Sequence, residues 1–244
     1  MISVIFENDD FIVVSKPENE DFHDADEQLG FFNRVKEALA LDELYPIHRL
    51  DKVTSGLLLM AKTLTACQAL NLGFENRTTR KLYLAVATGK PKKKQGLIKG
   101  DMERSRRGSW RLLRTTQNPA ITRFLSSGLG EGTRAYLLSP KTGKTHQLRV
   151  AMKSIGAPIL GDSLYAGDAA DRVYLHAFAL QLTFNNTPYV FSCLPTTGKY
   201  FQHLLEHEWL APLLLPETDF GSQADSSPEI CHKQYLEELF ERLS

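Results

Sequence analysis

The segment RKLYLAVATGK, residues 80–90, alternates in side-chain character with the two-residue period of a β-strand. Leu82, Leu84 and Val86 fall on one side of that strand, and Tyr83 falls on the other side. A strand of this kind has to bury its apolar side against a second layer of the protein. The segment therefore requires a sheet with a core on one face, and it directs Tyr83 away from that core.

Other segments add to this sheet and supply helices around it. By their periodicity and turn residues, strands are expected at 2–17 (two strands around an Asn-Asp-Asp turn), 56–63, 97–139 (several strands), 173–184 and 189–195. Apolar residues at helical spacing predict helices at 29–39, 65–77, 145–156, 200–210 and 232–243. Because strands outnumber helices and several form successive hairpins, we expect an α+β fold with peripheral helices and a mixed, mainly antiparallel sheet.

The chain of 244 residues is long enough for one large domain, which we place at residues 1–213. Residues 216–230 have the composition of a linker, so 214–244 are expected to form a linker and a C-terminal helix. The longest apolar runs are too short for a membrane span, and the acidic N-terminus does not resemble a signal peptide. Three scattered cysteines suit reduced thiols in a cytoplasm. We also expect a monomer without membrane contact.

The net charge of zero hides an uneven distribution of charged side chains. Residues 77–123 contain 14 basic and 2 acidic residues, whereas the two ends of the chain are acidic. Two basic runs, 90–96 and 103–114, lie close together, and the second includes Trp110. A solvated basic hairpin would explain them, but this pattern favours contact with nucleic acid. The predicted phosphate contacts in these runs are Lys92, Lys93, Lys94, Arg106 and Arg107.

Two short motifs resemble a phosphate-binding loop and a zinc-binding helix, but each match is weak. TGKT at 142–145 resembles the end of a phosphate-binding P-loop, but Leu138 stands where that loop needs its first glycine. We instead expect the start of a helix here, capped by Thr142 or Thr145. HLLEH at 203–207 matches a zinc-binding helix pattern, yet two histidines on a solvated helical face are the commoner outcome. We therefore predict no metal site.

Asp51 is the strongest candidate for a reacting group. It lies between Arg49 and Lys52, directly ahead of the apolar run 56–61. Positive neighbours favour the ionised carboxylate, which is a poor general acid but suits nucleophilic attack or stabilisation of a developing cation. A salt-bridged aspartate in a turn remains the alternative at this point.

Three segments around these residues resemble the main motifs of the RluA-type pseudouridine synthases. They are HRLDKVTSGLLLMAKT (48–63), RKLYLAVATG (80–89) and TGKTHQLRVAMKSIGAPILGDSLY (142–165), and they occur in the order and spacing of that family. Residues 173–184 resemble the strand that follows, and the similarity extends over roughly residues 1–210. Lys144 stands where the family usually has an arginine, a change that keeps the charge.

The resemblance implies an enzyme that isomerises uridine to pseudouridine in ribosomal or transfer RNA, without cofactor or metal. It implies two subdomains facing a basic cleft, with Asp51 as nucleophile or base. Tyr83 would pack on the extruded base, Arg149 would pair with the catalytic carboxylate, and Arg49 would help to open the RNA. The further residues expected to contact RNA are His48, Lys81, Lys144 and His146.

The local pattern agrees with these roles for Tyr83 and Arg149. An aromatic side chain on the open side of a strand can stack on an extruded base, although packing in a second layer is the alternative. On the helix, Arg149 shares a face with His146 and Lys153, while the buried side consists of Leu148, Met152 and Ile155. We expect the Arg149 guanidinium to form a forked pair with Asp51.

Two other functions remain open from the sequence. One is an RNA-binding protein with an inactive synthase-like cleft, which the intact motif residues disfavour. The other is a hydrolase of nucleosides or sugars that uses a carboxylate. That reaction usually needs a second well-placed acid, and none is evident near Asp51.

Overall fold

The computed structural model describes residues 1–25, 28–210 and 228–244. The strands of its main sheet are β1 (Ser3–Glu7), β2 (Phe11–Lys16), β3 (Tyr45–Pro46), β4 (Ser55–Ala61), β5 (Arg80–Thr88), β6 (Gln95–Gly100), β9 (Ala120–Gly130), β10 (Thr133–Pro140), β11 (Leu175–Phe184) and β12 (Thr187–Ser192). A separate hairpin consists of β7 (Met102–Arg104) and β8 (Trp110–Leu112), with a 3₁₀ turn, η1 (Arg106–Gly108), between them. The helices are α1 (Phe31–Ala38), α2 (Leu64–Glu75), α3 (Gln147–Ser154), α4 (Lys199–Leu205) and α6 (Pro228–Arg242), and a second 3₁₀ turn is η2 (Ser163–Tyr165).

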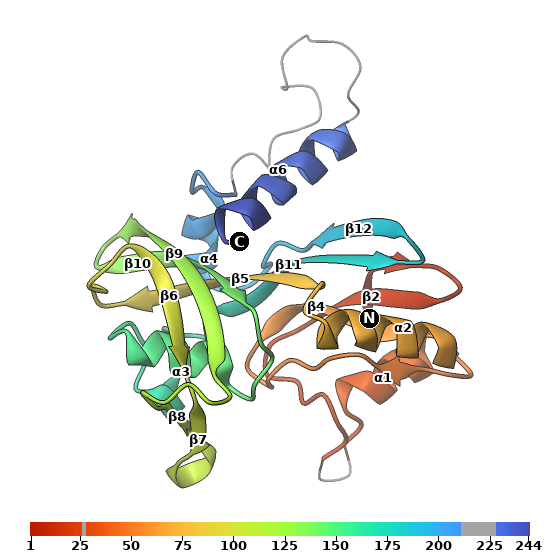
Figure 1. Ribbon diagram of the computed structural model, residues 1–244, viewed down its shortest axis with the longest axis horizontal. Coiled ribbons are helices and arrows are strands. Elements are labelled where there is room, and N and C mark those ends of the chain that lie inside the picture. Colours follow the sequence, from red (N-terminus) through yellow and green to blue (C-terminus); the bar gives the residue numbers. More distant parts are fainter. Residues whose placement is uncertain (26–27, 211–227) are drawn as a thin grey trace.

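The main sheet runs through the whole molecule in the order β1-β2-β4-β11-β5-β10-β9-β6. All its neighbouring strands are antiparallel except β4 and β11, which pair in parallel. Figure 1 shows α3 and the β7–β8 hairpin in one half and α1 and α2 in the other, with α6 above the sheet and its C-terminal end near the sheet's centre. The prediction of an α+β fold with a mixed, mainly antiparallel sheet is confirmed.

Apolar layers on both faces of the sheet hold the helices in place. In the β2–β4 half, α1 packs through Phe31 and Val35 against one face, and α2 packs through Ala66 and Leu70 against the other. The hydroxyl of Thr63 caps α2 by accepting a hydrogen bond from the backbone N–H of Ala66. A third and larger apolar cluster surrounds β5, β10 and β11, and includes residues of α3, α4 and α6.

The Thr-Ser-Gly sequence at 54–56 has the composition of a turn, but most of it lies in a strand. Ser55 and Gly56 already belong to β4, and the turn lies one step earlier, closed by the hydrogen bond from Thr54 N to Asp51 O at 3.0 Å. Gly56 has φ of 108°, and a Cβ atom there would lie 2.3 Å from the carbonyl oxygen of Ala177. Glycine is therefore required where β4 begins its parallel pairing with β11.

Two helices differ from their predicted form at their ends. The N-cap position of α3 is His146, in the left-handed conformation (φ 57°), so neither Thr142 nor Thr145 caps the helix. Instead, the Gln147 side chain accepts hydrogen bonds from Lys144 N at 3.1 Å and from Thr142 Oγ1 at 2.7 Å. The helix predicted at 200–210 ends at Leu205, so the HLLEH motif does not lie on one continuous helix.

The C-terminal helix packs on the main domain through Leu236, Leu239, Phe240 and Leu243. The side chain of Arg80, at the start of β5, is bonded to the end of this helix, with an ion pair to Glu241 at 2.8 Å. The greater part of the predicted linker at 216–230 lies outside the described residues. Among the helices described, none is long and apolar enough to cross a membrane.

Candidate active site

Asp51 lies in the turn that leads into β4, and a buried lysine holds this turn in place. Lys16, at the end of β2, is fully buried, and its Nζ donates to the carbonyl oxygen of Lys52 at 3.1 Å. The same ammonium donates to the carbonyl oxygens of Pro17 at 2.7 Å and Glu20 at 2.8 Å. Burial lowers the pKa of Lys16 to about 8. The protonated lysine ties three backbone segments together and leaves the Asp51 carboxylate free to face outward.

The cationic partner of Asp51 is Arg149, from the distant helix α3. Its Nη1 lies 3.7 Å from Asp51 Oδ2, and the Asp51 side chain is 19% exposed. Lys52, the neighbour in sequence, is instead paired with Asp21 at 2.6 Å. Part of the positive charge beside Asp51 is therefore supplied by Arg149, a residue far away in the sequence that the fold brings close.

The forked pair predicted between Arg149 and Asp51 is wrong, because Arg149 forms it with Asp162. Arg149 Nε and Nη2 donate to the two Asp162 carboxylate oxygens at 2.7 and 2.8 Å, and both side chains are buried. Two parallel charge-assisted bonds fix the plane of the guanidinium. The remaining nitrogen, Nη1, is the one that reaches Asp51.

Tyr83 and Lys81, on β5, lie on the other side of the site. Tyr83 is half-buried between two apolar clusters, so part of its ring packs in the core and part lines the pocket. Burial and the Asp51 carboxylate raise the pKa of Tyr83, which keeps its hydroxyl protonated at neutral pH. Lys81 Nζ lies 5.1 Å from the centre of the Phe74 ring, and burial lowers its pKa to about 8.

His48 is held inside the wall of the site. Its Nε2 accepts a hydrogen bond from Leu59 N at 3.0 Å, and its ring stacks on Phe74 at 5.2 Å between centroids. Burial, helped by the nearby Lys81, lowers the pKa of His48 to about 3. The imidazole is therefore neutral, and one of its nitrogens already has a backbone partner.

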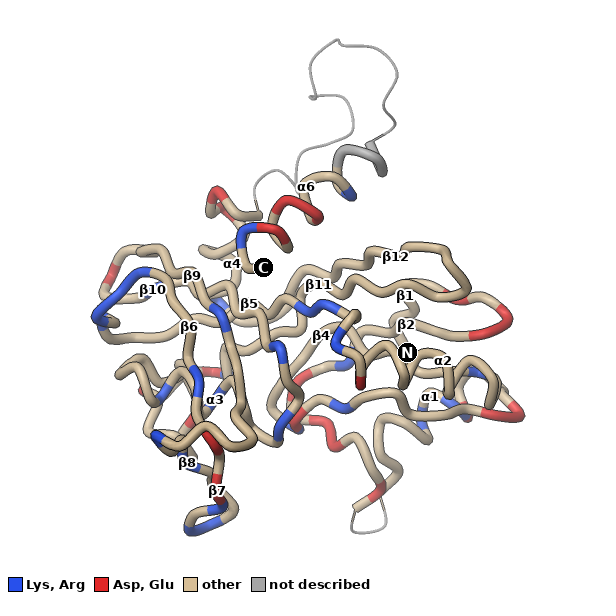
Figure 2. The backbone as a smooth tube through the Cα atoms, in the orientation of Figure 1, with Lys and Arg blue, Asp and Glu red and all other residues tan. Residues whose placement is uncertain are grey.

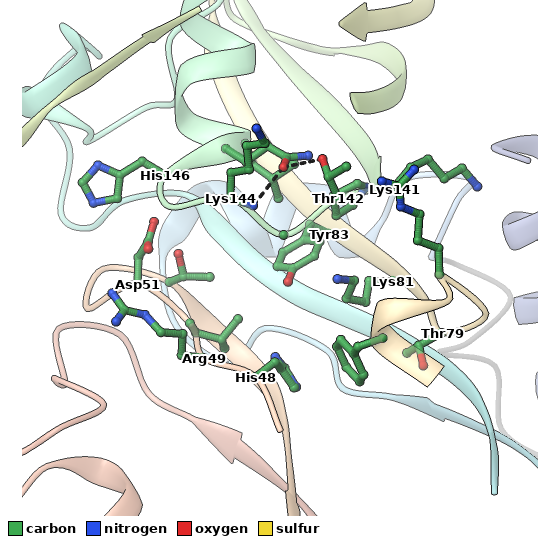
Figure 3. Close-up of a pocket in the computed structure, with 18 of the residues that line it drawn as sticks. His48, Arg49, Asp51, Thr79, Lys81, Tyr83, Lys141, Thr142, Lys144 and His146 are labelled. Carbon is green, nitrogen blue, oxygen red and sulfur yellow. Dashed lines mark hydrogen bonds between the residues drawn. The ribbon is translucent and has the colours of Figure 1, made fainter. Parts of the chain in front are cut away.

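Of these side chains, His48, Asp51, Lys81 and Tyr83 line one pocket of about 540 Å³. Figure 3 shows Asp51 and His146 at one end of it and Lys81 at the other, with Tyr83 between them. The predicted site residues that line this pocket are His48, Arg49, Asp51, Lys81, Tyr83, Lys144 and His146. Its volume is in the range of pockets that hold small ligands.

A second pocket, of about 330 Å³, adjoins the first at Asp51. Arg49, Asp51 and His146 line both pockets, whereas Arg149 lines only the second. The rest of its wall comes from Asp21, Phe22, His23, Asp24, Ala25, Leu50, Lys52 and Val53. The Asp51 side chain is thus accessible from both pockets. Across the described chain, no group of three or more His, Cys, Asp or Glu side chains is arranged to hold a metal ion.

Not every residue expected to contact RNA belongs to these pockets. Lys92, Lys93 and Lys94 lie in the loop after β5, at the opposite end of that strand from Lys81, and Figure 2 shows this basic loop at the outer edge. Arg106 and Arg107 lie in η1, at the tip of the β7–β8 hairpin. These five residues line neither of the two pockets.

Sequence reasoning missed several residues that build the site. Asp162 and Tyr165 lie within the third motif, in ILGDSLY, but nothing in the local pattern shows that they face Arg149 and His146. Lys16 and Phe74 likewise read as ordinary strand and helix residues. The available signal for Asp162 was an acid among turn residues shortly after the helix that carries Arg149.

Comparison with known proteins places this chain in one family. The family model described as RNA pseudouridylate synthase matches residues 10–154. An uncharacterized RNA pseudouridine synthase of Haemophilus influenzae is 45% identical over 202 residues, covering 82% of this chain and 90% of that protein. The dual-specificity RNA pseudouridine synthase RluA of Escherichia coli O6:H1 is 32% identical over 196 residues, covering 74% of this chain and 86% of that protein. The structure of human RNA pseudouridylate synthase domain containing 1 matches with a TM-score of 0.67 and 25% identity, covering 80% of this chain and 83% of that chain.

The fold and the matched sequence define an RNA-modifying isomerase. The chain belongs to the RluA-type RNA pseudouridine synthase family, whose reaction is an intramolecular isomerisation. The resemblance seen in the three sequence motifs is therefore confirmed.

Proposed function

We propose that this protein converts uridine to pseudouridine in structured ribosomal or transfer RNA, with Asp51 as the reacting carboxylate. The observation that carries the proposal is the convergence of Asp51, Tyr83 and Arg149, from three separate segments, on adjoining pockets. The dual-specificity name of the Escherichia coli relative supports testing more than one kind of RNA.

The roles of these residues follow from their surroundings. Asp51 is partly exposed and faces the Arg149 guanidinium, so its carboxylate is placed for attack or for proton abstraction. Tyr83 offers an aromatic edge and a protonated hydroxyl to a base that has left its helix. Arg49 lines both pockets beside Asp51, so it is well placed to occupy the space that the base vacates.

We further infer that the two halves of the sheet flank a basic RNA-binding cleft. Lys81 and Lys144 contribute ammonium groups to the pocket itself. The β7–β8 hairpin and the loop containing Lys92–Lys94 add cations further out, where they would contact phosphates. Such contacts set affinity and orientation more than the choice of uridine.

The competing hydrolase function is less well supported by this geometry. Glycoside hydrolysis generally uses two carboxyl groups on either side of the bond that breaks. The acid nearest to the Arg149 side of the site, Asp162, is buried, and both of its oxygens accept hydrogen bonds from Arg149. It is not available to protonate a leaving group. The other two acids of the second pocket also have partners, since Asp21 pairs with Lys52 and Asp24 accepts hydrogen bonds from Gly30 N and the Asn33 amide.

The test is to incubate the protein with ribosomal and transfer RNA pools that lack the modification and to map new pseudouridines. The wild type should form product in at least one pool, and Asp51→Asn should form none. Asp42→Asn, a change of the same kind at an exposed position outside both pockets, should behave as wild type. Unchanged RNA in both pools would favour the binding-only alternative, and product from Asp51→Asn would remove Asp51 from the chemistry.

A further inference from the structure

A buried tyrosine connects the base of the β7–β8 hairpin to the histidine beside Asp51. The Tyr165 hydroxyl accepts a hydrogen bond from the backbone N–H of Trp110 at 3.0 Å, and it lies 2.8 Å from Nδ1 of His146. Tyr165 is 1% exposed, so its hydroxyl has no access to bulk water. The arrangement determines which nitrogen of His146 carries the proton.

The donors and acceptors around the Tyr165 oxygen fix the direction of its hydrogen bond to His146. The Trp110 N–H can only donate, so the phenol proton is left to find an acceptor. If His146 Nδ1 carried a proton, two donors would point at the Tyr165 oxygen and the buried phenol proton would have no partner. Buried polar groups are rarely left in that state. The phenol therefore donates to an unprotonated Nδ1, and the proton of the neutral imidazole is on Nε2.

The Nε2–H group is free to act on a ligand. Within the described chain, no hydrogen bond to His146 Nε2 is present, and the side chain lines both pockets together with Asp51. Figure 3 shows the imidazole and the Asp51 carboxylate at the same end of the pocket. The left-handed backbone of His146 (φ 57°) is uncommon for a residue with a side chain, and it occurs where the imidazole turns toward the pocket.

The same tyrosine also packs against the cation that faces Asp51. The Arg149 guanidinium lies over the Tyr165 ring, 5.0 Å from its centre, and the Tyr165 N–H donates to the carbonyl oxygen of Asp162 at 3.1 Å. Tyr165 thus contacts both groups next to Asp51. It also contacts the first residue of β8, at the base of the basic hairpin.

We propose that His146, held by Tyr165 as the Nε2–H tautomer, is a hydrogen-bond donor to an oxygen of the target nucleotide beside Asp51. Tyr165 is then a positioning residue that acts through His146. This inference rests on the proposed function, because it assumes that the target nucleotide enters the pocket lined by Asp51. It adds a donor to that site and links the donor to the hairpin proposed to contact RNA.

The charges around His146 set the expected pH dependence. Asp51 and Arg49 face it from the turn before β4, Arg149 from α3, and Asp162 from the loop before η2. Partial burial lowers the pKa of His146, and among the charged neighbours Asp51 opposes this most strongly. A phenol that donates to Nδ1 stabilises the neutral ring, so its removal should make His146 take up a proton at higher pH.

The first test reads the tautomer directly in the full-length protein without RNA. Nitrogen-resolved NMR of ¹⁵N-histidine-labelled protein at pH 7 should show His146, assigned by its loss in His146→Gln, as the neutral Nε2–H form. In Tyr165→Phe the Nδ1–H form should appear, and the ring should titrate at higher pH. Tyr174→Phe is the matched control, because the Tyr174 hydroxyl is buried and also makes two hydrogen bonds, to Asp171 and Tyr200. An Nδ1–H or doubly protonated His146 in the wild type would overturn the proposal.

The second test separates a donor from a structural contact. Tyr165→Phe should lower kcat about tenfold at neutral pH with KM within about twofold, and the loss should shrink toward low pH, because the doubly protonated imidazole carries an Nε2–H group again. His146→Gln keeps an N–H donor and should retain more activity than His146→Ala. Adding Tyr165→Phe to His146→Ala should cost little more, since Tyr165 acts through His146. Equal losses for Tyr165→Phe with and without His146 would overturn the proposal. If the wild type modifies no RNA, the proposed function fails, and NMR with added RNA still decides whether Nε2–H has a ligand oxygen near it.

Discussion

Arg149 donates two hydrogen bonds to Asp162, from Nε at 2.7 Å and from Nη2 at 2.8 Å. This buried pair turns the third guanidinium nitrogen toward Asp51, 3.7 Å away. An arginine with only Asp51 as its partner could swing toward solvent or toward an RNA phosphate. The pair with Asp162 makes Arg149 a fixed positive charge, so the site is preorganised before RNA binds.

The first prediction concerns this ion pair. Asp162→Asn removes the charge that balances Arg149 in the protein interior, so the free energy of unfolding should fall by about 3 kcal/mol. The exposed ion pair of Arg111 with Glu103 offers a matched control, and Glu103→Gln should show no measurable loss. Urea unfolding of the three proteins makes the comparison. Equal stability of Asp162→Asn and wild type would mean that the pair does not fix Arg149.

The second prediction uses the depressed pKa of Lys81. Burial lowers this pKa to about 8, so the ammonium carries its charge below that pH and loses it above. RNA affinity should therefore decrease between pH 7 and pH 9, by about fivefold if the lost contact contributes about 1 kcal/mol. Lys81→Arg keeps the charge throughout, and its affinity should stay constant over the same range. The dissociation constants can be measured by titrating labelled RNA, and parallel pH curves for the two proteins would exclude Lys81 as the cause.

The third prediction tests the basic loop at the edge of the sheet. Replacing Lys92, Lys93 and Lys94 by glutamine should weaken RNA binding and reduce the slope of log affinity against log salt by about 2 to 3, because each phosphate contact releases counterions. Replacing Lys36, Lys199 and Lys233 by glutamine removes the same amount of charge from α1, α4 and α6. This control variant should keep the wild-type slope. If the loop variant also keeps that slope, the RNA does not reach the loop.

The fourth prediction concerns stability and the buried His176. Its two ring nitrogens bond to Ser55 Oγ and to the Cys193 carbonyl oxygen, both at 2.8 Å, and burial lowers its pKa from 6.5 to about 4. The unfolded chain takes up this proton first, so the contribution to stability is complete above pH 6.5 and is lost as the pH falls toward 4. The free energy of unfolding should fall in that window by up to about 1.4 kcal/mol per pH unit.

Two variants isolate this effect from the titration of carboxylates. In His176→Asn the decrease of unfolding free energy between pH 6.5 and pH 4 should be smaller than in the wild type. His23→Asn changes an exposed histidine and should leave the decrease unchanged. Chemical unfolding at several pH values gives both slopes, and the same slope in all three proteins would contradict the prediction.

Much of the architecture could be predicted from the sequence because the patterns that specify strands and helices are local. The alternation of residues 80–90 and the helical spacing in 29–39 depend only on near neighbours, and both elements formed where expected. The three motifs likewise identified the family from their residues, their order and their spacing. The ends of elements were less certain, because Gly56 and His146 adopt left-handed backbone conformations that tertiary contacts impose.

The partners within the site were decided by the folded structure. Asp51 has two basic neighbours in sequence, yet Lys52 pairs with Asp21 and the guanidinium 3.7 Å away belongs to Arg149. Tyr83 lies near the start of β5, whereas Lys92–Lys94 follow its end, so these lysines do not line the pocket that Tyr83 lines. An ion pair or a pocket joins residues that are far apart in sequence, and its geometry depends on how strands pair and helices pack. Periodicity and composition specify which face of an element is buried. Which side chains this face contacts depends on how all the strands and helices of the sheet pack.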